Sequence, residues 1–470
     1  MNYAGVKRIH LVGVAGTGMG SFAGLLGAAG YQVTGSDANV YPPMSTELAR
    51  LGIEVLTPYG PANLDRARPD LVVVGNVVRR ENPEAAALRD RGLPHVSFPQ
   101  ALGDLFIAPR HGCAVVGTHG KTTATAMLAA VLFHAGRDPS FLVGGVARDF
   151  DASFRLGKGP HFVVEGDEYD TAYFDKGPKF LHYRPRTAVF TSCELDHADI
   201  YRDEAHYERA FERFADILPP DGFLAACAGW ESVHRIARRA RCPVETYSAS
   251  READWTAGGL ALGPGGASFE LVRRGASLAR VSLPVGGAQN VENALGVAAA
   301  AAALGLSPGE IARGLAAFRG VRRRQELRGV AGGVAVIDDF AHHPTATART
   351  LEAVASRYPG ARVLACFEPR SNTSRRNLHQ EEYAGAFPGA AGVFLLRPAP
   401  HDQVPAAERL DADRLVRDIA ARGTPARAFA AVDEMVEAVA AEARPGDVVL
   451  AMSNGAFGGI WEKLLGRLGS

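Results

Sequence analysis

The chain of 470 residues has few cysteines and no surplus of charge of either sign. Its five cysteines are scattered and none forms a CxxC pair, which argues against a disulfide framework or a zinc site and fits a reducing cytoplasm. Lys+Arg and Asp+Glu both total 51, so the formal net charge is zero. This balance excludes an overall attraction to nucleic acid or to an anionic membrane, and leaves only a local basic site for phosphate.

Long hydrophobic runs are also missing. The alanine-rich segment 294–306 has 13 residues, whereas a helix needs about 20 to span a bilayer, and its alanine content favours a buried helix. The apolar N-terminus is similar to a signal peptide in composition, but residues 8–16 are better interpreted as a strand that runs into a glycine turn. We therefore expect a cytoplasmic protein with no membrane partner, either a monomer or a weak homodimer.

The length predicts about three domains, at roughly 100–200 residues each. Short apolar runs alternate with stretches of helical length from the N-terminus on, which is typical of βαβ units with a parallel sheet. Similar strand-to-glycine openings recur near residues 113 and 333, so the predicted fold is α/β with domains at 1–107, 108–322 and 323–470. We expect a linker at 106–112 and a boundary segment at 319–333. Strands are predicted at 8–14, 31–35, 53–55, 71–75, 95–97, 161–165, 187–191, 223–226, 244–247, 268–283, 362–367, 392–396, 427–429 and 447–451.

The sharpest motif is a glycine-rich loop between an apolar run and a helical stretch, Gly117-Thr-His-Gly-Lys-Thr-Thr123. Strand, loop and helix in this order predict a phosphate-binding loop, in which backbone N–H groups and the helix N-terminus face phosphate oxygens. Lys121 would then neutralise phosphate charge and face a triphosphate rather than a core, while the Thr122 hydroxyl would ligate Mg²⁺. The alternative is a tight turn with a surface lysine, but lysine is scarce in this arginine-rich chain.

Two acidic clusters follow further apolar runs. The first holds Glu165, Asp167 and Glu168, and a strand that ends in carboxylates downstream of a phosphate loop predicts a Mg²⁺ ligand. The second holds Asp196 and His197, where His197 is a candidate metal ligand that Asp196 or Glu194 would orient. A solvated acidic turn and a packing histidine are the alternatives.

The first predicted strand leads into another glycine-rich loop, and Asp37 lies about twenty residues further on. This arrangement is similar to a dinucleotide-binding fingerprint, in which the acid meets a ribose. The glycine spacing matches only approximately, so the loop predicts a nucleotide or nucleotide-sugar site rather than NAD in particular. Segment 290–293 begins the alanine-rich helix, where it could cap the helix or contact a base. Segment 322–324 lies at the second domain boundary, where it could reach a phosphate across a cleft or form a solvated basic linker. Segments 338–344 and 368–373 each follow a predicted strand, and the carboxyl ends of strands are where open α/β sheets bind ligands.

These motifs together resemble the Mur ligase family, the ATP-dependent amide-forming ligases of bacterial cell-wall precursors. The resemblance covers essentially the whole chain. It implies a Rossmann-like N-terminal domain that binds UDP-N-acetylmuramate, a central P-loop domain that binds ATP, and a Rossmann-like C-terminal domain that binds the incoming amine. The motifs that carry it are 117–123, 165–168, 196–197, Asn290 with Asn293, 323–324 and 338–344.

Two branches of the family share the His-His-Pro motif of residues 342–344. One adds L-alanine to UDP-N-acetylmuramate, and the other adds the recycled tripeptide L-Ala-γ-D-Glu-meso-diaminopimelate to the same nucleotide. Segments 36–46, 165–170 with 174–176, 368–373 and 452–459 resemble the tripeptide branch. The resemblance thus implies a ligase of peptidoglycan recycling that works through an acyl phosphate, with ATP as co-substrate and Mg²⁺ as cofactor.

The resemblance also implies roles for individual residues, and Lys121, His197 and Arg324 are expected to be the catalytic ones. Ser192 and Gln289 depart from the family pattern, which has Asn at the first position and His at the second. Some members of the family carry a carbamylated lysine shortly after the metal-binding histidine. Residues 198–220 contain no lysine, so none is expected here. The expected ATP contacts are Gly117, Thr118, His119, Gly120, Lys121, Thr122, Thr123, Asn290, Asn293, Arg324 and Asp339. The expected metal ligands are Thr122 for one Mg²⁺ and Glu165 with His197 for a second. The UDP-sugar is assigned to Gly16, Thr17, Gly18, Met19, Asp37 and Asn76, and the peptide to Arg370, Ser371, Asn372 and Thr373.

Three alternatives stay open. The alanine-adding branch of the same family differs only in the acceptor. An NAD(P)-dependent oxidoreductase would use the N-terminal loop and Asp37, but it leaves the phosphate loop, its carboxylates and the third domain unexplained. A nucleotide-dependent binding or regulatory protein without turnover is the third alternative, which detection of an amide product would exclude.

Overall fold

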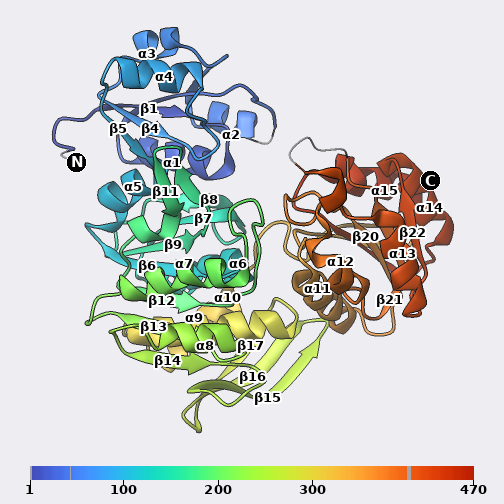
Figure 1. The fold of residues 1–470 in the computed structure, drawn as a ribbon. Helices are drawn as coiled ribbons and strands as arrows, with labels where there is room; N and C mark the ends of the chain where they lie inside the picture. Colours follow the sequence, from blue (N-terminus) through green and yellow to red (C-terminus); the bar gives the residue numbers. More distant parts are fainter. Residues whose placement is uncertain (1–2, 43, 400–403, 470) are drawn as a thin grey trace.

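The computed structural model describes residues 3–42, 44–399 and 404–469. Figure 1 shows an N-terminal unit seated on a central unit, with a third unit beside them. Each unit is built on its own sheet, and most strand pairs in all three sheets are parallel. None of the helices in the described ranges has the length and apolar character that a bilayer crossing needs.

The N-terminal sheet has five parallel strands in the order β3-β2-β1-β4-β5. Helices α1 and α5 pack on one face of this sheet and α3 and α4 on the other. This order is that of a doubly wound nucleotide-binding sheet, and it places the ends of β1 and β2 side by side. The elements are β1 (Arg8–Val12), α1 (Thr17–Ala28), β2 (Gln32–Ser36), α2 (Met44–Arg50), β3 (Glu54–Leu56), α3 (Pro61–Ala67), β4 (Leu71–Val74), α4 (Pro83–Asp90), β5 (His95–Ser97) and α5 (Phe98–Leu102).

The central sheet has ten strands in the order β17-β16-β15-β14-β13-β12-β6-β9-β7-β8. Its middle is parallel, while β8 at one end and β16 and β17 at the other pair in antiparallel fashion. The strands are β6 (His111–Val116), β7 (Ser140–Ala147), β8 (Ala152–Arg155), β9 (His161–Gly166), β12 (Thr187–Phe190), β13 (Phe223–Cys227), β14 (Val244–Tyr247), β15 (Trp255–Gly263), β16 (Gly266–Arg273) and β17 (Ala276–Leu283), and a separate hairpin holds β10 (Asp170–Ala172) and β11 (Asp175–Pro178). The helices are α6 (Lys121–His134), α7 (Glu204–Asp216), α8 (Glu231–Ala237), α9 (Ala288–Ala303) and α10 (Pro308–Ala317).

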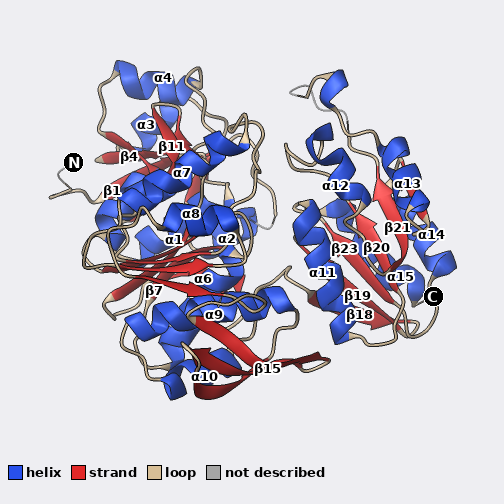
Figure 2. Cartoon of the chain, turned by 60° about the horizontal axis from the view of Figure 1, so that its bottom comes forward, coloured by secondary structure: helices blue, strands red, loops and turns tan. Residues whose placement is uncertain are grey.

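The third sheet has six strands in the order β18-β19-β23-β20-β21-β22, and only the edge strand β18 is antiparallel. Two separate clusters of apolar side chains lie on its two faces, one with side chains of α11 to α13 and one with side chains of α14 and α15. Figure 2 shows α11 and α12 on one side of the sheet and α14 and α15 on the other. The elements are β18 (Glu326–Ala331), β19 (Val334–Asp339), α11 (Pro344–Arg357), β20 (Val363–Phe367), α12 (Gln380–Ala384), β21 (Ala390–Leu396), α13 (Ala412–Ala421), β22 (Ala426–Phe429), α14 (Val432–Glu442), β23 (Val448–Met452) and α15 (Ile460–Leu468).

The α/β prediction with three sheets is confirmed, but some local expectations were wrong. The linker expected at 106–112 is shorter, because a π-helical turn covers Gly103–Ile107 and β6 begins at His111. The boundary segment 319–333 contains β18, an edge strand whose glycine and arginine content hides its pattern. Strands β7 and β15 were missed for a related reason, since each contains a pair of glycines that predicts a loop.

Candidate active site

Three neighbouring parallel strands of the central sheet, β12, β6 and β9, end at the same edge. The glycine-rich loop follows β6, Glu165 lies near the end of β9, and the segment 191–199 follows β12. Parallel strands present their carboxyl ends together, so three motifs far apart in the sequence meet at one place.

The glycine-rich loop has the conformation of a tight strand-to-helix connection. Gly117 has φ 130° and Gly120 has φ 80°, values that side-chain-bearing residues rarely adopt. Space is also short, because a Cβ on Gly117 would lie 2.7 Å from the Ser192 nitrogen and one on Gly120 would lie 2.5 Å from Asn293 Oδ1. The hydroxyl of Ser192, one of the two departures from the family pattern, accepts a hydrogen bond from the His119 N–H at 2.7 Å.

Lys121 is held inside the protein by a carboxylate. Its Nζ donates to Glu168 Oε2 at 3.0 Å and to the carbonyl oxygens of Gly117 and Thr118, and Glu168 is fully buried. Burial opposes the charge of Glu168, yet Lys121 and His197 lower its pKa to about 2. The expectation that the charge of Lys121 does not face a core is therefore wrong, because the buried carboxylate of Glu168 balances it in this structure.

Thr122 and Glu165 form the most convincing cation-binding pair. The Thr122 hydroxyl donates to Glu165 Oε1 at 2.8 Å, and Glu165 Oε2 accepts from the Gly144 N–H at 2.7 Å. Burial, and next the charge of Asp167, raise the pKa of Glu165. A cation here would compensate the half-buried carboxylate of Glu165, and a hydroxyl with a carboxylate suits Mg²⁺ as a hard ion. These residues therefore fit the ion.

His197 lies next to the same cluster, in a left-handed conformation with φ 56°. Its Nε2 is 3.2 Å from Glu168 Oε1 and 3.8 Å from Asp196 Oδ2. Burial works against protonation, but these two carboxylates raise the pKa of His197 to about 9. Of the two residues expected to orient it, Asp196 does lie beside it, whereas Glu194 pairs with His119 at 2.8 Å.

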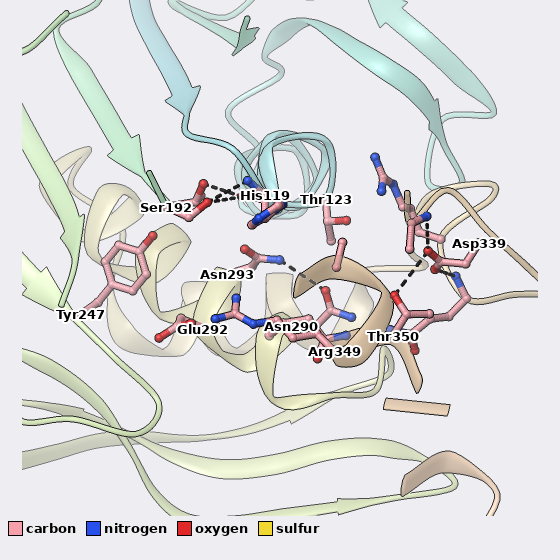
Figure 3. A pocket seen from close by; sticks show the side chains of 17 residues that line it. His119, Thr123, Ser192, Tyr247, Asn290, Glu292, Asn293, Asp339, Arg349 and Thr350 are labelled. Carbon is pink, nitrogen blue, oxygen red and sulfur yellow. Dashed lines mark hydrogen bonds between the residues drawn. The ribbon is translucent and has the colours of Figure 1, made fainter. Parts of the chain in front are cut away.

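A pocket opens beside the phosphate loop, between the central and the third unit (Figure 3). Its lining brings together residues of five sequence motifs that the chain keeps far apart. Asn290 and Asn293 contribute from the first turns of α9, and Gln289, the other departure from the family pattern, lies beside them. The lining includes His119, Gly120, Thr123, Ser192, Tyr247, Gln289, Asn290, Glu292, Asn293, Arg324, Asp339, Arg349 and Thr350.

Arg324 lies in the connection between the central and the third unit, and its side chain reaches the phosphate loop. Its Nη2 lies 3.3 Å from the Thr122 hydroxyl, and its guanidinium stacks on Phe340 at 4.9 Å. Asp339 stabilises the same turn, because its carboxylate accepts from the Gln325 and Ala341 N–H groups, both at 2.8 Å. A cation brought this close to the loop can neutralise charge on a bound phosphate.

The loop after β20 connects the third unit to the central one. The Thr373 hydroxyl accepts from the Ala198 N–H at 3.3 Å, and Asn372 Nδ2 donates to Asp199 at 3.1 Å. Ser371 is turned toward Ser374 within its own loop. Arg370 has a 46% exposed side chain, 3.9 Å from Glu368, so it is available to a ligand but is not desolvated.

The N-terminal loop stands apart from this cluster. Asp37 is buried and its carboxylate accepts hydrogen bonds from the N–H groups of Ala15, Ala38 and Asn39 at 2.9, 2.8 and 3.2 Å. Asp37 thus fixes the loop backbone between β1 and α1. Of the other residues assigned to this site, Gly16, Thr17 and Asn76 are exposed, Gly18 is half-buried and Met19 is buried.

Sequence reasoning assigned no role to several residues of the cluster. Glu168 was noted only as part of an acidic motif, and its pairing with Lys121 depends on the exact fold of segment 166–170. Arg349 lines the pocket from α11 and stacks on Trp230 at 5.3 Å. Glu168 belongs to the 165–168 motif, but the motif did not show that its partner is Lys121, and Arg349 belongs to none of the motifs.

The fold and the site define an α/β protein of three units, with a glycine-rich strand-to-helix loop beside a pocket between the central and the third unit. Three family models match along the chain: "Mur ligase family, catalytic domain" at residues 8–109, "Mur ligase middle domain" at 115–301 and "Mur ligase, glutamate ligase domain" at 323–455. The chain belongs to the Mur ligase family, whose members are ATP-dependent amide-forming ligases.

Curated relatives from both branches match nearly the whole chain. The UDP-N-acetylmuramate–L-alanyl-γ-D-glutamyl-meso-2,6-diaminoheptandioate ligase of Escherichia coli is 40% identical, over 98% of each chain. The UDP-N-acetylmuramate–L-alanine ligase of Clostridium tetani is 32% identical, over 96% of each. Among solved structures, a murein peptide ligase from Psychrobacter arcticus matches with a TM-score of 0.73 and 35% identity, over 99% of each chain.

Proposed function

We propose that this chain joins the tripeptide L-Ala-γ-D-Glu-meso-diaminopimelate to UDP-N-acetylmuramate at the expense of ATP. The observation that carries the proposal is the contact between the loop after β20 and the segment after β12, through Thr373 and Asn372. This contact places a loop with an exposed arginine against the segment after β12, which itself contacts the phosphate loop through Glu194 and His119. The 40% identity to the tripeptide ligase of Escherichia coli supports the tripeptide as the acceptor.

The reaction proceeds in two displacements. An oxygen of the muramic carboxylate attacks the γ-phosphorus of ATP, and ADP leaves with the electrons of the broken P–O bond. The free amine of the peptide's L-Ala then attacks the acyl phosphate, loses a proton, and expels phosphate as the amide forms. No enzyme nucleophile is needed, so catalysis consists of positioning and charge neutralisation.

Different residues of the site would contact the phosphates, the metal ion and the nucleoside. Lys121 of the phosphate loop and Arg324, whose Nη2 lies 3.3 Å from the Thr122 hydroxyl, would neutralise the transferred phosphoryl group. Thr122, Glu165 and His197 would hold Mg²⁺, which when bound neutralises phosphate charge. Asn290, Asn293 and Asp339 line the pocket in which the nucleoside would lie.

Replacing Asp37 by alanine is expected to weaken UDP-N-acetylmuramate binding at least tenfold and to change ATP affinity less than twofold. The variant removes the acceptor of three backbone N–H groups in the N-terminal unit, far in the chain from the phosphate loop. Calorimetric titration of each nucleotide measures both effects. Saturable binding of NADH in competition with UDP-N-acetylmuramate would instead support a dehydrogenase.

We expect kcat/KM to be at least 100-fold higher for the tripeptide than for free L-alanine. A peptide carries carboxylates remote from its reacting amine, and Arg370 can bind one of them and so orient the amine. Initial rates of amide formation with each acceptor, at saturating ATP and UDP-N-acetylmuramate, measure the ratio. A ratio of one or less would place the chain with the alanine-adding branch.

Arg370→Ala is the matched variant for this comparison. Since its side chain is 46% exposed, we expect a loss nearer to that of a charged hydrogen bond, about 1.5–3 kcal/mol, than to that of a buried ion pair. The loss should appear in kcat/KM for the tripeptide and not in any activity with L-alanine. An equal loss for both acceptors would mean that Arg370 maintains the loop rather than binding the peptide.

A further inference from the structure

Three side chains meet at the seam between the central and the third unit: His119, Glu194 and His343. One donor atom from each lies within 4.8 Å of the others. Glu194 Oε2 is 2.8 Å from His119 Nε2 and 3.7 Å from His343 Nδ1. His119 belongs to the phosphate loop, Glu194 to the segment after β12, and His343 precedes α11 of the third unit, so the cluster joins two units.

The cluster is largely removed from solvent. The side chains of His119, Glu194 and His343 are 13%, 29% and 4% exposed. Burial, and next the charge of His119, lower the pKa of His343 to about 3, so its imidazole is neutral at physiological pH. A neutral imidazole has a lone pair to offer, and the only hydrogen bond to His343 Nδ1 within the described ranges is a long one of 3.4 Å from the Thr345 N–H.

A second observation concerns the other nitrogen of this ring. His343 Nε2 is buried and has no hydrogen-bond partner among the described residues, and the same is true of His379 Nε2. The two rings lie 4.7 Å apart, and His379 Nδ1 is 3.6 Å from Glu382. Because His343 Nδ1 accepts the Thr345 N–H, the ring proton lies on Nε2 and the lone pair lies on Nδ1, the nitrogen 3.7 Å from Glu194.

We propose that His119 Nε2, Glu194 Oε2 and His343 Nδ1 bind a borderline divalent transition-metal ion, Zn²⁺ in particular. Two imidazoles and one carboxylate with an open fourth position form a donor set that Zn²⁺ commonly takes. Mg²⁺ prefers oxygen donors, so this site is separate from the Thr122–Glu165 pair. The ligands come from two units, and the bound ion therefore ties the third unit to the central one.

Calorimetric titration of metal-stripped protein with Zn²⁺ tests the site. We expect the wild-type chain to bind one equivalent and to gain in melting temperature, because an ion that binds only the folded state stabilises it. Titration with Co²⁺ should give the visible absorption of a tetrahedral site. Failure of the wild-type chain to bind Zn²⁺ overturns the proposal.

His343→Asn is the decisive variant, because asparagine can still accept the Thr345 N–H at the start of α11 while it lacks the imidazole. We expect it to lose at least tenfold in Zn²⁺ affinity and all of the Zn²⁺-dependent gain in melting temperature. His234→Asn, on the exposed side of α8, is the matched control and should bind like the wild type. Glu194→Gln replaces His343→Asn if the metal-free variant does not fold.

Three further outcomes overturn the assignment. Wild-type affinity in folded His343→Asn would exclude this histidine as a ligand. Loss of binding in His197→Asn but not in His343→Asn would place the ion in the Glu165–His197 region. A thiolate-to-Co²⁺ charge-transfer band would likewise assign the ion to one of the buried cysteines. None of these readouts depends on catalytic turnover, so the site and the proposed function fail separately.

Discussion

Replacing Lys121 by alanine is expected to lower ATP-dependent phosphate release by about 10³-fold or more, the range seen when a preorganised charge is removed from a transferred group. Lys121 is the ammonium donor of the phosphate loop, and the guanidinium of Arg324, which reaches Thr122 of the same loop, does not replace it. Release of phosphate at saturating ATP, UDP-N-acetylmuramate and tripeptide is the measurement. Wild-type-like release would contradict the assignment of the loop.

The same substitution also leaves Glu168 as a buried carboxylate without its ammonium partner. Breaking a buried pair costs up to about 3–5 kcal/mol, so Lys121→Ala should melt at a lower temperature. The control is Lys121→Ala combined with Glu168→Gln, which removes the stranded charge and keeps the side-chain size. We expect this double variant to recover the melting temperature but not the activity, which separates the loss of catalysis from the loss of stability.

Replacing His197 by asparagine is expected to raise the Mg²⁺ concentration needed for half-maximal rate by about 10–100-fold, the cost typical of a disturbed metal site. Asparagine is the better choice than alanine, because it tolerates the left-handed backbone at φ 56°. Titration of the rate with Mg²⁺, and of Mn²⁺ binding by electron paramagnetic resonance, measures the effect. An unchanged titration would make His197 a packing residue beside Glu168.

The pH dependence provides the control for this prediction. Only a neutral imidazole ligates a cation, and Asp196 and Glu168 raise the pKa of His197 to about 9 despite its burial. Protons therefore compete with the cation below this pH, and the metal affinity of the wild-type chain should fall as the pH drops from 9 toward 7. In His197→Asn this part of the pH dependence should disappear.

The sequence predicted the parts of this molecule that follow from local pattern. Glycines before a lysine and two threonines predicted the phosphate loop, and the observed φ values of Gly117 and Gly120 are those that such a loop requires. Apolar runs predicted most parallel strands. Glycine-rich strands such as β7 and β15 were not predicted, because pairing with neighbouring strands, and not their own residues, keeps them extended.

The electrostatic pairings could not be predicted, because they depend on distances between chain segments. Lys121 and Glu168 are 47 positions apart, and their contact needs β6 and β9 in register. The meeting of Thr373 with Ala198 spans 175 positions and two units. The resemblance to a family implied roles for single residues. It did not show which carboxylate pairs with which cationic side chain in the structure.

The most direct test of the account follows oxygen atoms from the muramic carboxylate. UDP-N-acetylmuramate labelled with ¹⁸O in both carboxylate oxygens is incubated with ATP, Mg²⁺, the tripeptide and the enzyme. Mass spectrometry then measures the ¹⁸O content of each product. If the carboxylate attacks the γ-phosphorus, one ¹⁸O leaves in inorganic phosphate and the other stays in the amide of the tripeptide product. Unlabelled phosphate, or label in AMP, would contradict the account.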